Sequence, residues 1–237
     1  MYQRILIKLS GEALQGNSKN GIIDPEALLN TAKAVKQIAD LGVEISIVIG
    51  AGNICRGALV EKTGMDRVLG DQMGMLGTII NSFAIKDALI KQGLKTEVLS
   101  AVEVERFTPT YQPALADRLL KEKTVVIFGG GTGKPFYSTD TCASLRAIET
   151  NCEAILIAKN GVDGIYDDDP KVNKNAKKFD TIKCSEIIAR NLKVIDLSAV
   201  ELLKDKDIDV CVFNMSNFDN FKKVVLKEHI GTTIMKG

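Results

Sequence analysis

The chain has 237 residues, 45% of them hydrophobic, and its 31 Lys and Arg almost balance its 30 Asp and Glu. This composition is typical of a globular chain with enough apolar residues for a sizeable core. A net charge of +1 argues against broad nucleic-acid binding. The single histidine, His229, excludes multi-histidine metal centres and argues against a Ser-His-Asp triad.

Cysteine usage and the N-terminal segment predict a cytoplasmic protein without a membrane span. The cysteines are odd in number, scattered and without a C-x-x-C pair, which predicts reduced and mostly buried thiols. The first apolar run reaches Lys8 almost at once, and no stretch approaches the ~18 apolar residues of a membrane span. The thiols are those of Cys55, Cys142, Cys152, Cys184 and Cys211.

Apolar runs and helical patterns alternate along the chain. In order, they predict a strand at 4–9, a helix from the Asp24-Pro25 cap to Leu41-Gly42, a strand at 44–49, a helix at 72–92, a strand at 96–101, a helix at 111–121, a strand at 124–128, a helix at 139–151, strands at 154–158 and 209–214, a helix at 216–228 and a strand at 232–236. Strands that are apolar on both faces indicate a mainly parallel sheet covered on both sides. The predicted fold class is therefore a three-layer α/β sandwich.

Glycine-rich loops follow three of these strands. Strand 4–9 runs into Ser10-Gly11, strand 44–49 into 50–53, and strand 124–128 into 129–135. Glycine after any one strand also serves an ordinary tight turn. Three such loops, each with a basic residue in or beside it, favour phosphate binding at the carboxyl edge of the sheet.

Two common phosphate motifs fail on inspection. A P-loop needs G-x-x-x-x-G-K-S/T, but around Gly133-Lys134 the first glycine is replaced by Phe128 and the hydroxyl by Pro135. The dinucleotide fingerprint G-x-G-x-x-G fails because Cys55 and Lys134 stand at its third glycine. The phosphate site must therefore be distributed over several strand ends.

Six segments, in order along the whole chain, resemble those of the bacterial UMP kinases in the amino acid kinase superfamily. They are KLSGEAL (8–14), VIGAGNICRG (48–57), GMDRVLGDQMGML (64–76), GGGTGKPFYSTD (129–140), AKNGVDGIYDDDP (158–170) and VIDLSA (194–199). The resemblance implies an amino acid kinase-like fold for 1–237, with a UMP-binding half (1–150) and an ATP-binding half (151–237). It also implies direct in-line phosphoryl transfer from ATP to UMP, a step of pyrimidine nucleotide biosynthesis.

The same resemblance implies four catalytic residues: Lys8, Arg56, Asp140 and Asp196. Cations at strand ends suit phosphoryl transfer, which mainly needs positioning and charge cancellation. A lysine inside an apolar strand can also be a solvated side chain that reaches water. Asp140 can alternatively be a simple cap of helix 141–150.

The implied UMP site gathers residues from three segments: Gly50, Ala51, Asp71, Thr132, Gly133, Lys134, Pro135, Phe136, Tyr137, Ser138 and Thr139. Ala51 departs from the three successive glycines of many relatives, and its Cβ puts the tightness of that turn in question. Lys134 stands where some relatives carry asparagine. Asp71 is expected to hold the ribose, and it is also a candidate cap for a helix that begins near Gln72.

The implied ATP site comprises Lys8, Leu9, Ser10, Gly11, Gly52, Arg56, Asn160, Tyr166 and Asp169. Mg²⁺ is expected on the ATP phosphates rather than at a protein metal site, because no carboxylate pair has convincing spacing. The composition of the polar stretch 167–178 fits both a functional loop and a solvated connection.

Relatives of this kind form homohexamers, are inhibited by UTP and are often activated by GTP, so these are the implied partners and effectors. The segment 16–21 lies in the region linked to GTP response, although its composition also fits an ordinary loop. Two alternatives stay open at this point. One is a superfamily member that phosphorylates a small carboxylate or carbamate, and the other is a nucleotide-sensing regulatory protein with weak catalysis.

Overall fold

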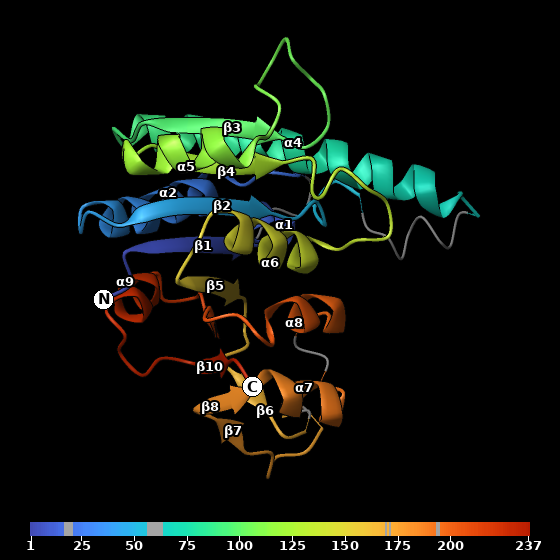
Figure 1. Cartoon of the computed structure of the whole chain (residues 1–237), viewed down its shortest axis with the longest axis vertical. Helices are drawn as coiled ribbons and strands as arrows, with labels where there is room; N and C mark the ends of the chain where they lie inside the picture. Colours follow the sequence, from blue (N-terminus) through green and yellow to red (C-terminus); the bar gives the residue numbers. More distant parts are fainter. Residues whose placement is uncertain (17–20, 56–63, 169, 171, 193–194) are drawn as a thin grey trace.

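The computed structural model describes residues 1–16, 21–55, 64–168, 170, 172–192 and 195–237, and within them an eight-stranded sheet forms the centre of the molecule (Figure 1). Its order is β3 (Thr96–Ser100), β4 (Val125–Gly129), β2 (Glu44–Ile49), β1 (Arg4–Leu9), β5 (Ala154–Lys159), β9 (Asp209–Asn214), β10 (Thr232–Met235) and β8 (Thr181–Lys183). The strands from β3 to β9 are parallel, while β10 runs antiparallel to β9. Strands β6 (Ile165–Tyr166) and β7 (Lys178–Phe179) form a separate small ribbon.

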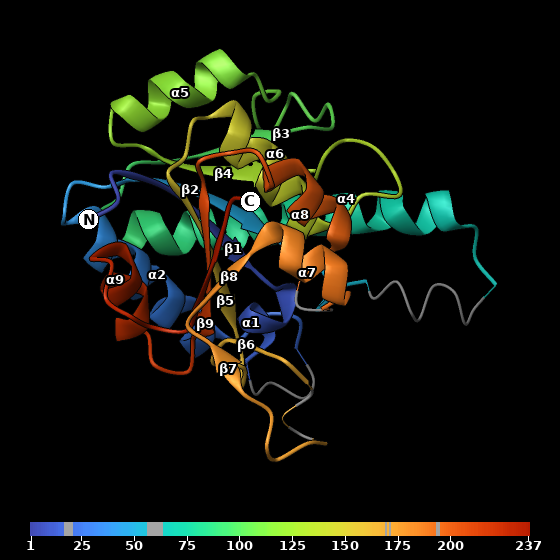
Figure 2. The same cartoon turned by 60° about the horizontal axis from the view of Figure 1, so that its bottom comes forward.

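Helices cover both faces of the sheet, as the two views in Figures 1 and 2 show. One face carries α1 (Gly11–Gln15), α2 (Pro25–Ala39), α4 (Arg67–Lys91) and α9 (Asp219–Val225). The other carries α5 (Pro113–Lys121), α6 (Thr139–Glu149), α7 (Cys184–Arg190) and α8 (Leu197–Leu203). The predicted three-layer α/β sandwich with a mainly parallel sheet is confirmed.

The two-residue period of the strands divides the core into two parts. In β1, Ile5 and Ile7 pack into the apolar cluster under α2, α4 and α9, whereas Leu6 packs into the cluster under α5, α6 and α8. Alternate side chains of a strand point to opposite faces. Lys8 therefore lies on the same face as Leu6, the face that α6 covers.

The predicted strands and three of the predicted helices begin and end within two residues of the elements in the structure. Two predicted helices were wrong in extent. The helix expected at 72–92 begins at Arg67, because the Asp66 carboxylate caps it by accepting the Leu69 N–H at 3.1 Å. The helix expected at 216–228 shrinks to 219–225, and Lys227 leaves helical geometry with φ of 63°.

The short elements α1, α7, α8, β6, β7 and β8 were not predicted, because strands of two or three residues and helices of two turns or fewer give only a weak periodic signal. By length and composition alone α4 could cross a membrane, but half of its most apolar window is buried in the fold. This is the behaviour of a core helix, and its buried side faces the sheet.

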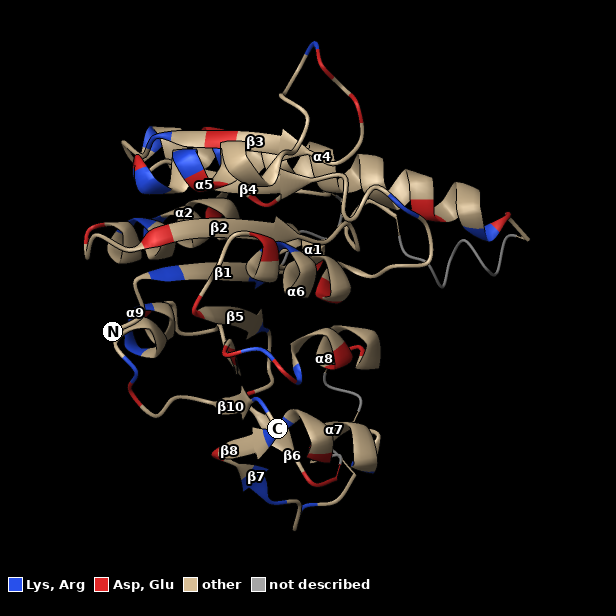
Figure 3. Cartoon of the chain, in the orientation of Figure 1, with Lys and Arg blue, Asp and Glu red and all other residues tan. Residues whose placement is uncertain are grey.

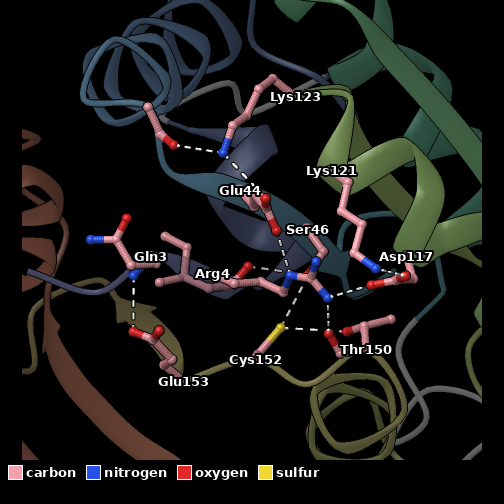
Figure 4. Close-up of polar contacts among 12 residues, drawn as sticks. Gln3, Arg4, Glu44, Ser46, Asp117, Lys121, Lys123, Thr150, Cys152 and Glu153 are labelled. Atoms are coloured by element: carbon pink, nitrogen blue, oxygen red, sulfur yellow. Dashed lines mark hydrogen bonds and ion pairs between the residues drawn. The ribbon is translucent and has the colours of Figure 1, made fainter.

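A charged network ties the strands together at their amino ends (Figure 4). The Arg4 guanidinium donates to Glu44 at 2.6 Å, to Asp117 at 2.8 Å and to the Thr150 carbonyl at 2.6 Å. Hydrogen bonds from Lys121 and Arg4 hold the pKa of Asp117 below its usual range. This edge is held by internal pairs, which points to the opposite, carboxyl edge as the place for a ligand.

Candidate active site

The carboxyl ends of β2, β1 and β5 lie next to one another, and the glycine loops open from that edge. Lys8 pairs in register with Val48 on one side and with Ile157 on the other. The chain leaves β1 at Ser10, β2 at Gly50 and β5 at Asn160. The order of strands therefore brings together segments that are up to 150 residues apart.

An ion pair lies at the centre of this edge. Lys8 Nζ is 2.6 Å from Oδ1 of Asp140, and the side chains are 13% and 15% exposed. Asp140 belongs to the first turn of α6, on the sheet face to which Lys8 points. A cation that is largely withdrawn from water and held by one carboxylate can bind an anionic group strongly, because the local dielectric is low. The reading of Lys8 as a freely solvated side chain is therefore wrong.

The cap of α6 is Ser138, not Asp140. The Ser138 hydroxyl accepts the N–H groups of Asp140 and Thr141 at 3.2 Å each. The Asp140 carboxylate is consequently available for Lys8 rather than occupied as a cap. The Ser138 hydroxyl, in contrast, already serves the helix.

A second lysine joins the cluster at the end of β5. Lys159 has the same parity as Ile155 and Ile157, so it shares the α6 face of the sheet with Lys8. Burial lowers the pKa of Lys159, while the charges of Asp140 and Asp196 oppose that shift and Lys8 adds to it. Asp196, expected to support Lys8, precedes α8, and its charge acts on Lys159.

The loop after β2 lies against the start of α1 without space between them. A Cβ at Gly11 would come within 2.3 Å of Asn53 Oδ1 and 2.7 Å of the Gly50 carbonyl oxygen. Gly50 donates its N–H to the Leu9 carbonyl at 2.9 Å, and the Leu9 side chain is buried in the core. Leu9 can therefore meet a ligand only through its backbone. Ser10 caps α1 by accepting the Ala13 N–H at 3.2 Å.

Asp71 connects α4 to the loop after β4. Its carboxylate accepts the Phe136 N–H at 2.7 Å and pairs with Arg67 at 3.0 Å. Asp71 lies inside the helix, so the prediction of a cap at this residue is wrong; the cap is Asp66. The structure thus brings Asp71 to the expected acceptor loop.

The acceptor loop is folded on itself before it reaches α6. Thr132 accepts the Lys134 N–H at 3.2 Å, while Gly133 and Phe136 adopt the left-handed region with φ of 77° and 70°. Pro135 follows Lys134, and the rings of Phe136 and Tyr137 are more than half exposed. Thr139 Oγ1 lies close to Gly50, where a Cβ would be 3.6 Å away, so the two loops meet there.

The expected ATP side borders a cavity. Asn160 lines a cavity of about 420 Å³ together with Asp24, Met215, Ser216 and Phe218. Tyr166 lies in β6 and donates its hydroxyl proton to Asp163 at 2.8 Å. Gly52 faces Glu12, whose Cγ would be 3.6 Å from an added Cβ. Arg56 and Asp169 lie outside the described residues.

Residues 3–214 match the amino acid kinase family. The chain belongs to the amino acid kinase family. Solved structures agree: the UMP kinase of Bacillus anthracis is 40% identical with a TM-score of 0.96, over 99% of this chain and 96% of that one. The UMP kinase of Ureaplasma parvum is 38% identical over the full length of both chains, with a TM-score of 0.93. The uridylate kinase of Archaeoglobus fulgidus is 25% identical over 97% of this chain and 99% of that one, with a TM-score of 0.73.

Sequence reasoning missed two residues that shape this amino acid kinase site. Lys159, like Lys8, is a lysine near the end of an apolar strand. The sequence analysis included it in the segment 158–170 but gave it no role of its own. Arg146 lay hidden in a helical pattern. Its buried guanidinium stacks 3.8 Å from the Tyr111 ring centroid, pairs with Glu149 at 2.6 Å and donates to the Gly131 carbonyl at 3.3 Å. It therefore supports the acceptor loop from α6.

We expect the native protein to show one readily reactive thiol, that of Cys55. All five cysteines are free and the other four are buried. Burial raises the pKa of Cys142 and of Cys211 to about 11, which suppresses their thiolates at neutral pH. Titration with a chromogenic disulfide should give one fast thiol in the native protein and five after denaturation. Cys55→Ser should remove the fast reaction and preserve turnover; a lost turnover in the folded variant would contradict this.

Proposed function

We propose that this amino acid kinase family member transfers the terminal phosphoryl group of ATP to UMP, giving ADP and UDP. The observation that carries the proposal is the placement of the Lys8–Asp140 pair between two groups of loops. The loops after β2 and β4 lie on one side, and the end of β5 lies on the other. The names of the similar solved structures, UMP kinases, support the same acceptor.

We assign the chain two functional parts, an acceptor half over 1–150 and an ATP half over 151–237. The acceptor phosphate lies on the loop from Gly50, and the base and ribose lie along 132–139 and Asp71. The ATP phosphates extend along Ser10-Gly11 toward Lys8, and the adenosine lies near Asn160 and Tyr166. Arg56 and Asp169 take the roles that the resemblance implies.

In the proposed reaction, the cations act on charge that spreads over the transferring phosphoryl group. Lys8 and Lys159 lie on the same sheet face and neutralise that charge, while Asp140 fixes the Lys8 ammonium. Asp196 helps to keep Lys159 charged, because its carboxylate favours the ammonium form. The acceptor phosphate is already anionic at neutral pH, so no general base is required.

We propose that Mg²⁺ arrives on the ATP phosphates. Among the described residues, no group of three or more His, Cys, Asp or Glu could hold a metal ion. Asp140, whose partner is Lys8, is committed to the ammonium group. Magnesium keeps several water ligands and commonly binds through substrate phosphates, where it neutralises phosphate charge.

A coupled assay of ADP formation tests this function. UMP, CMP, dUMP and a panel of small carboxylates and carbamates are offered with MgATP to the purified protein. UMP should be preferred by a large factor in kcat/KM. Preference for a carboxylate or carbamate would instead establish the related reaction class, and nucleotide binding without turnover would establish a regulatory protein.

Asp71→Asn should raise the KM for UMP and narrow the gap between UMP and dUMP. A charge-assisted hydrogen bond to a ribose hydroxyl contributes roughly 1.5–3 kcal/mol, or about 10- to 150-fold. The bond to the Phe136 N–H can be kept by the amide oxygen, so the loop stays near its position. Steady-state kinetics with both acceptors measures the ratio. Unchanged discrimination in a folded variant would remove Asp71 from the ribose site.

We propose a homohexamer in which α4 packs against a second copy of the chain. Leu69, Met73, Leu76 and Ile80 of α4 are exposed at intervals of three and four residues, so they form one stripe along the helix, and the exposed Met65 lies just before its cap. In Figure 3 the projecting part of α4 is tan apart from one red band and its charged amino end. Leu76→Glu should lower the assembly mass in light scattering; an unchanged mass would exclude this stripe from the interface.

We also propose that the protein is cytoplasmic, that UTP inhibits it and that GTP activates it. Free thiols support the location. Lys, Arg, Asp and Glu are interspersed over most elements, which fits small nucleotides better than a long polyanion as partner (Figure 3). Turnover at fixed ATP and UMP with added UTP or GTP tests both effectors.

A further inference from the structure

Ala51, in the loop after β2, and Gly77, in α4, lie so close together that only one of them can carry a Cβ atom. A Cβ at Gly77 of α4 would come within 2.8 Å of the Ala51 Cβ, closer than two carbon atoms can pack. Ala51 is buried and does not adopt a positive φ, so its side chain is accommodated without backbone strain. The structure therefore accommodates the Ala51 side chain, which many relatives lack, because Gly77 on α4 has no side chain opposite it.

The loop that carries Ala51 also packs closely against the start of α1. A Cβ at Gly11 would meet the Gly50 carbonyl oxygen at 2.7 Å and the Gly52 nitrogen at 2.8 Å. The loop therefore contacts both α1 and α4, with a glycine at each contact. This close packing leaves little room for the loop to move when a methyl group is added at Gly77.

A buried pair of amides anchors the same loop to α4. Asn81 donates to the Gly50 carbonyl at 2.8 Å and to Asn53 Oδ1 at 2.8 Å. Asn53 donates to Asn81 Oδ1 at 3.1 Å and to the Ile22 carbonyl at 2.6 Å. Both amide groups thus use both N–H donors, and such satisfied buried networks fix one geometry.

We propose that Gly77 is a positioning residue for the acceptor phosphate and that its match with Ala51 sets the distance between α4 and the loop Gly50–Asn53. This inference rests on the proposed function, which places the UMP phosphate on that loop. The helix also carries Asp71, so α4 positions the phosphate loop and the expected ribose contact together. A shift of the loop relative to α4 changes the distance between these two contacts.

The test is a double-mutant cycle with a matched control. Gly77→Ala should raise the KM for UMP by about 10-fold or more, since a misplacement near 1 Å can cost up to about 100-fold. The KM for ATP should change less than the KM for UMP, because the added methyl faces Ala51, in the loop to which the proposed function assigns the UMP phosphate. Ala51→Gly in the same chain should restore the KM for UMP. Gly74→Ala, one turn earlier on α4, meets open space and should be silent.

The outcomes separate positioning from a general structural effect. A defect that is equal for both substrates, or that Ala51→Gly does not relieve, overturns the proposal, as does a silent Gly77→Ala. If Gly77→Ala fails to fold, a folded double variant with the native KM supports the proposal, and a double variant that also fails overturns it. A wild-type protein without UMP kinase activity would overturn the proposed function itself.

Discussion

Lys8→Met should lower kcat by about 10²- to 10³-fold at saturating ATP and UMP, with a smaller effect on either KM. Removing one preorganised donor that acts on developing charge typically costs about 3–4 kcal/mol. Methionine keeps an apolar stem of similar length inside the strand, so the core of β1 should survive. If the contact strengthens during transfer, the loss must fall on kcat.

The matched control is Lys121→Met. Lys121 pairs with Asp117 at 2.7 Å on α5, and Asp117 also pairs with Arg4 at the amino edge of the sheet. Its removal should leave kcat unchanged. Circular dichroism and thermal unfolding establish that both variants fold. Near-native kcat for Lys8→Met would make Lys8 a binding or structural group and would remove it from the catalytic step.

Asp140→Asn should lower kcat by about 100-fold and move the basic limb of the pH profile to lower pH. The first effect follows because the amide no longer pairs with Lys8, which lies 2.6 Å from the carboxylate. The second follows because Asp140 favours the charged form of Lys159, whose pKa burial already lowers. Without that carboxylate, Lys159 loses its proton at lower pH, and activity that needs the ammonium declines earlier as pH rises.

A full kcat profile over pH tests the two effects separately. Asp117→Asn is the control, since it also removes a paired carboxylate but at the amino edge of the strands. It should change neither kcat nor the basic limb. A reduced kcat for Asp140→Asn with an unshifted basic limb would disconnect Lys159 from catalysis, while unchanged kcat would remove Asp140 from the site.

The sequence by itself determined the layers of the fold and the edge of the sheet at which the candidate site lies. Apolar runs such as 4–9 and 44–49 are buried on both faces, and this local pattern is independent of where the strands pair. Glycines at the strand ends indicated phosphate-binding loops, because the carboxyl ends of parallel strands lie at one edge of the sheet. The six ordered segments then pointed to the correct family, through residues whose spacing is local.

Only the tertiary structure decided which side chains meet. Lys8 and Asp140 are separated by more than 130 residues, and no local signal tells that α6 places the carboxylate on the Lys8 face. The sequence made Asp71 a candidate helix cap. In the structure the cap is Asp66, and the Asp71 carboxylate accepts the Phe136 N–H instead. The sequence put the tightness of the turn at Ala51 in question, whereas the structure places Gly77 opposite the Ala51 Cβ. Contacts of this kind depend on strand order and helix packing, which long-range burial fixes and local periodicity cannot encode.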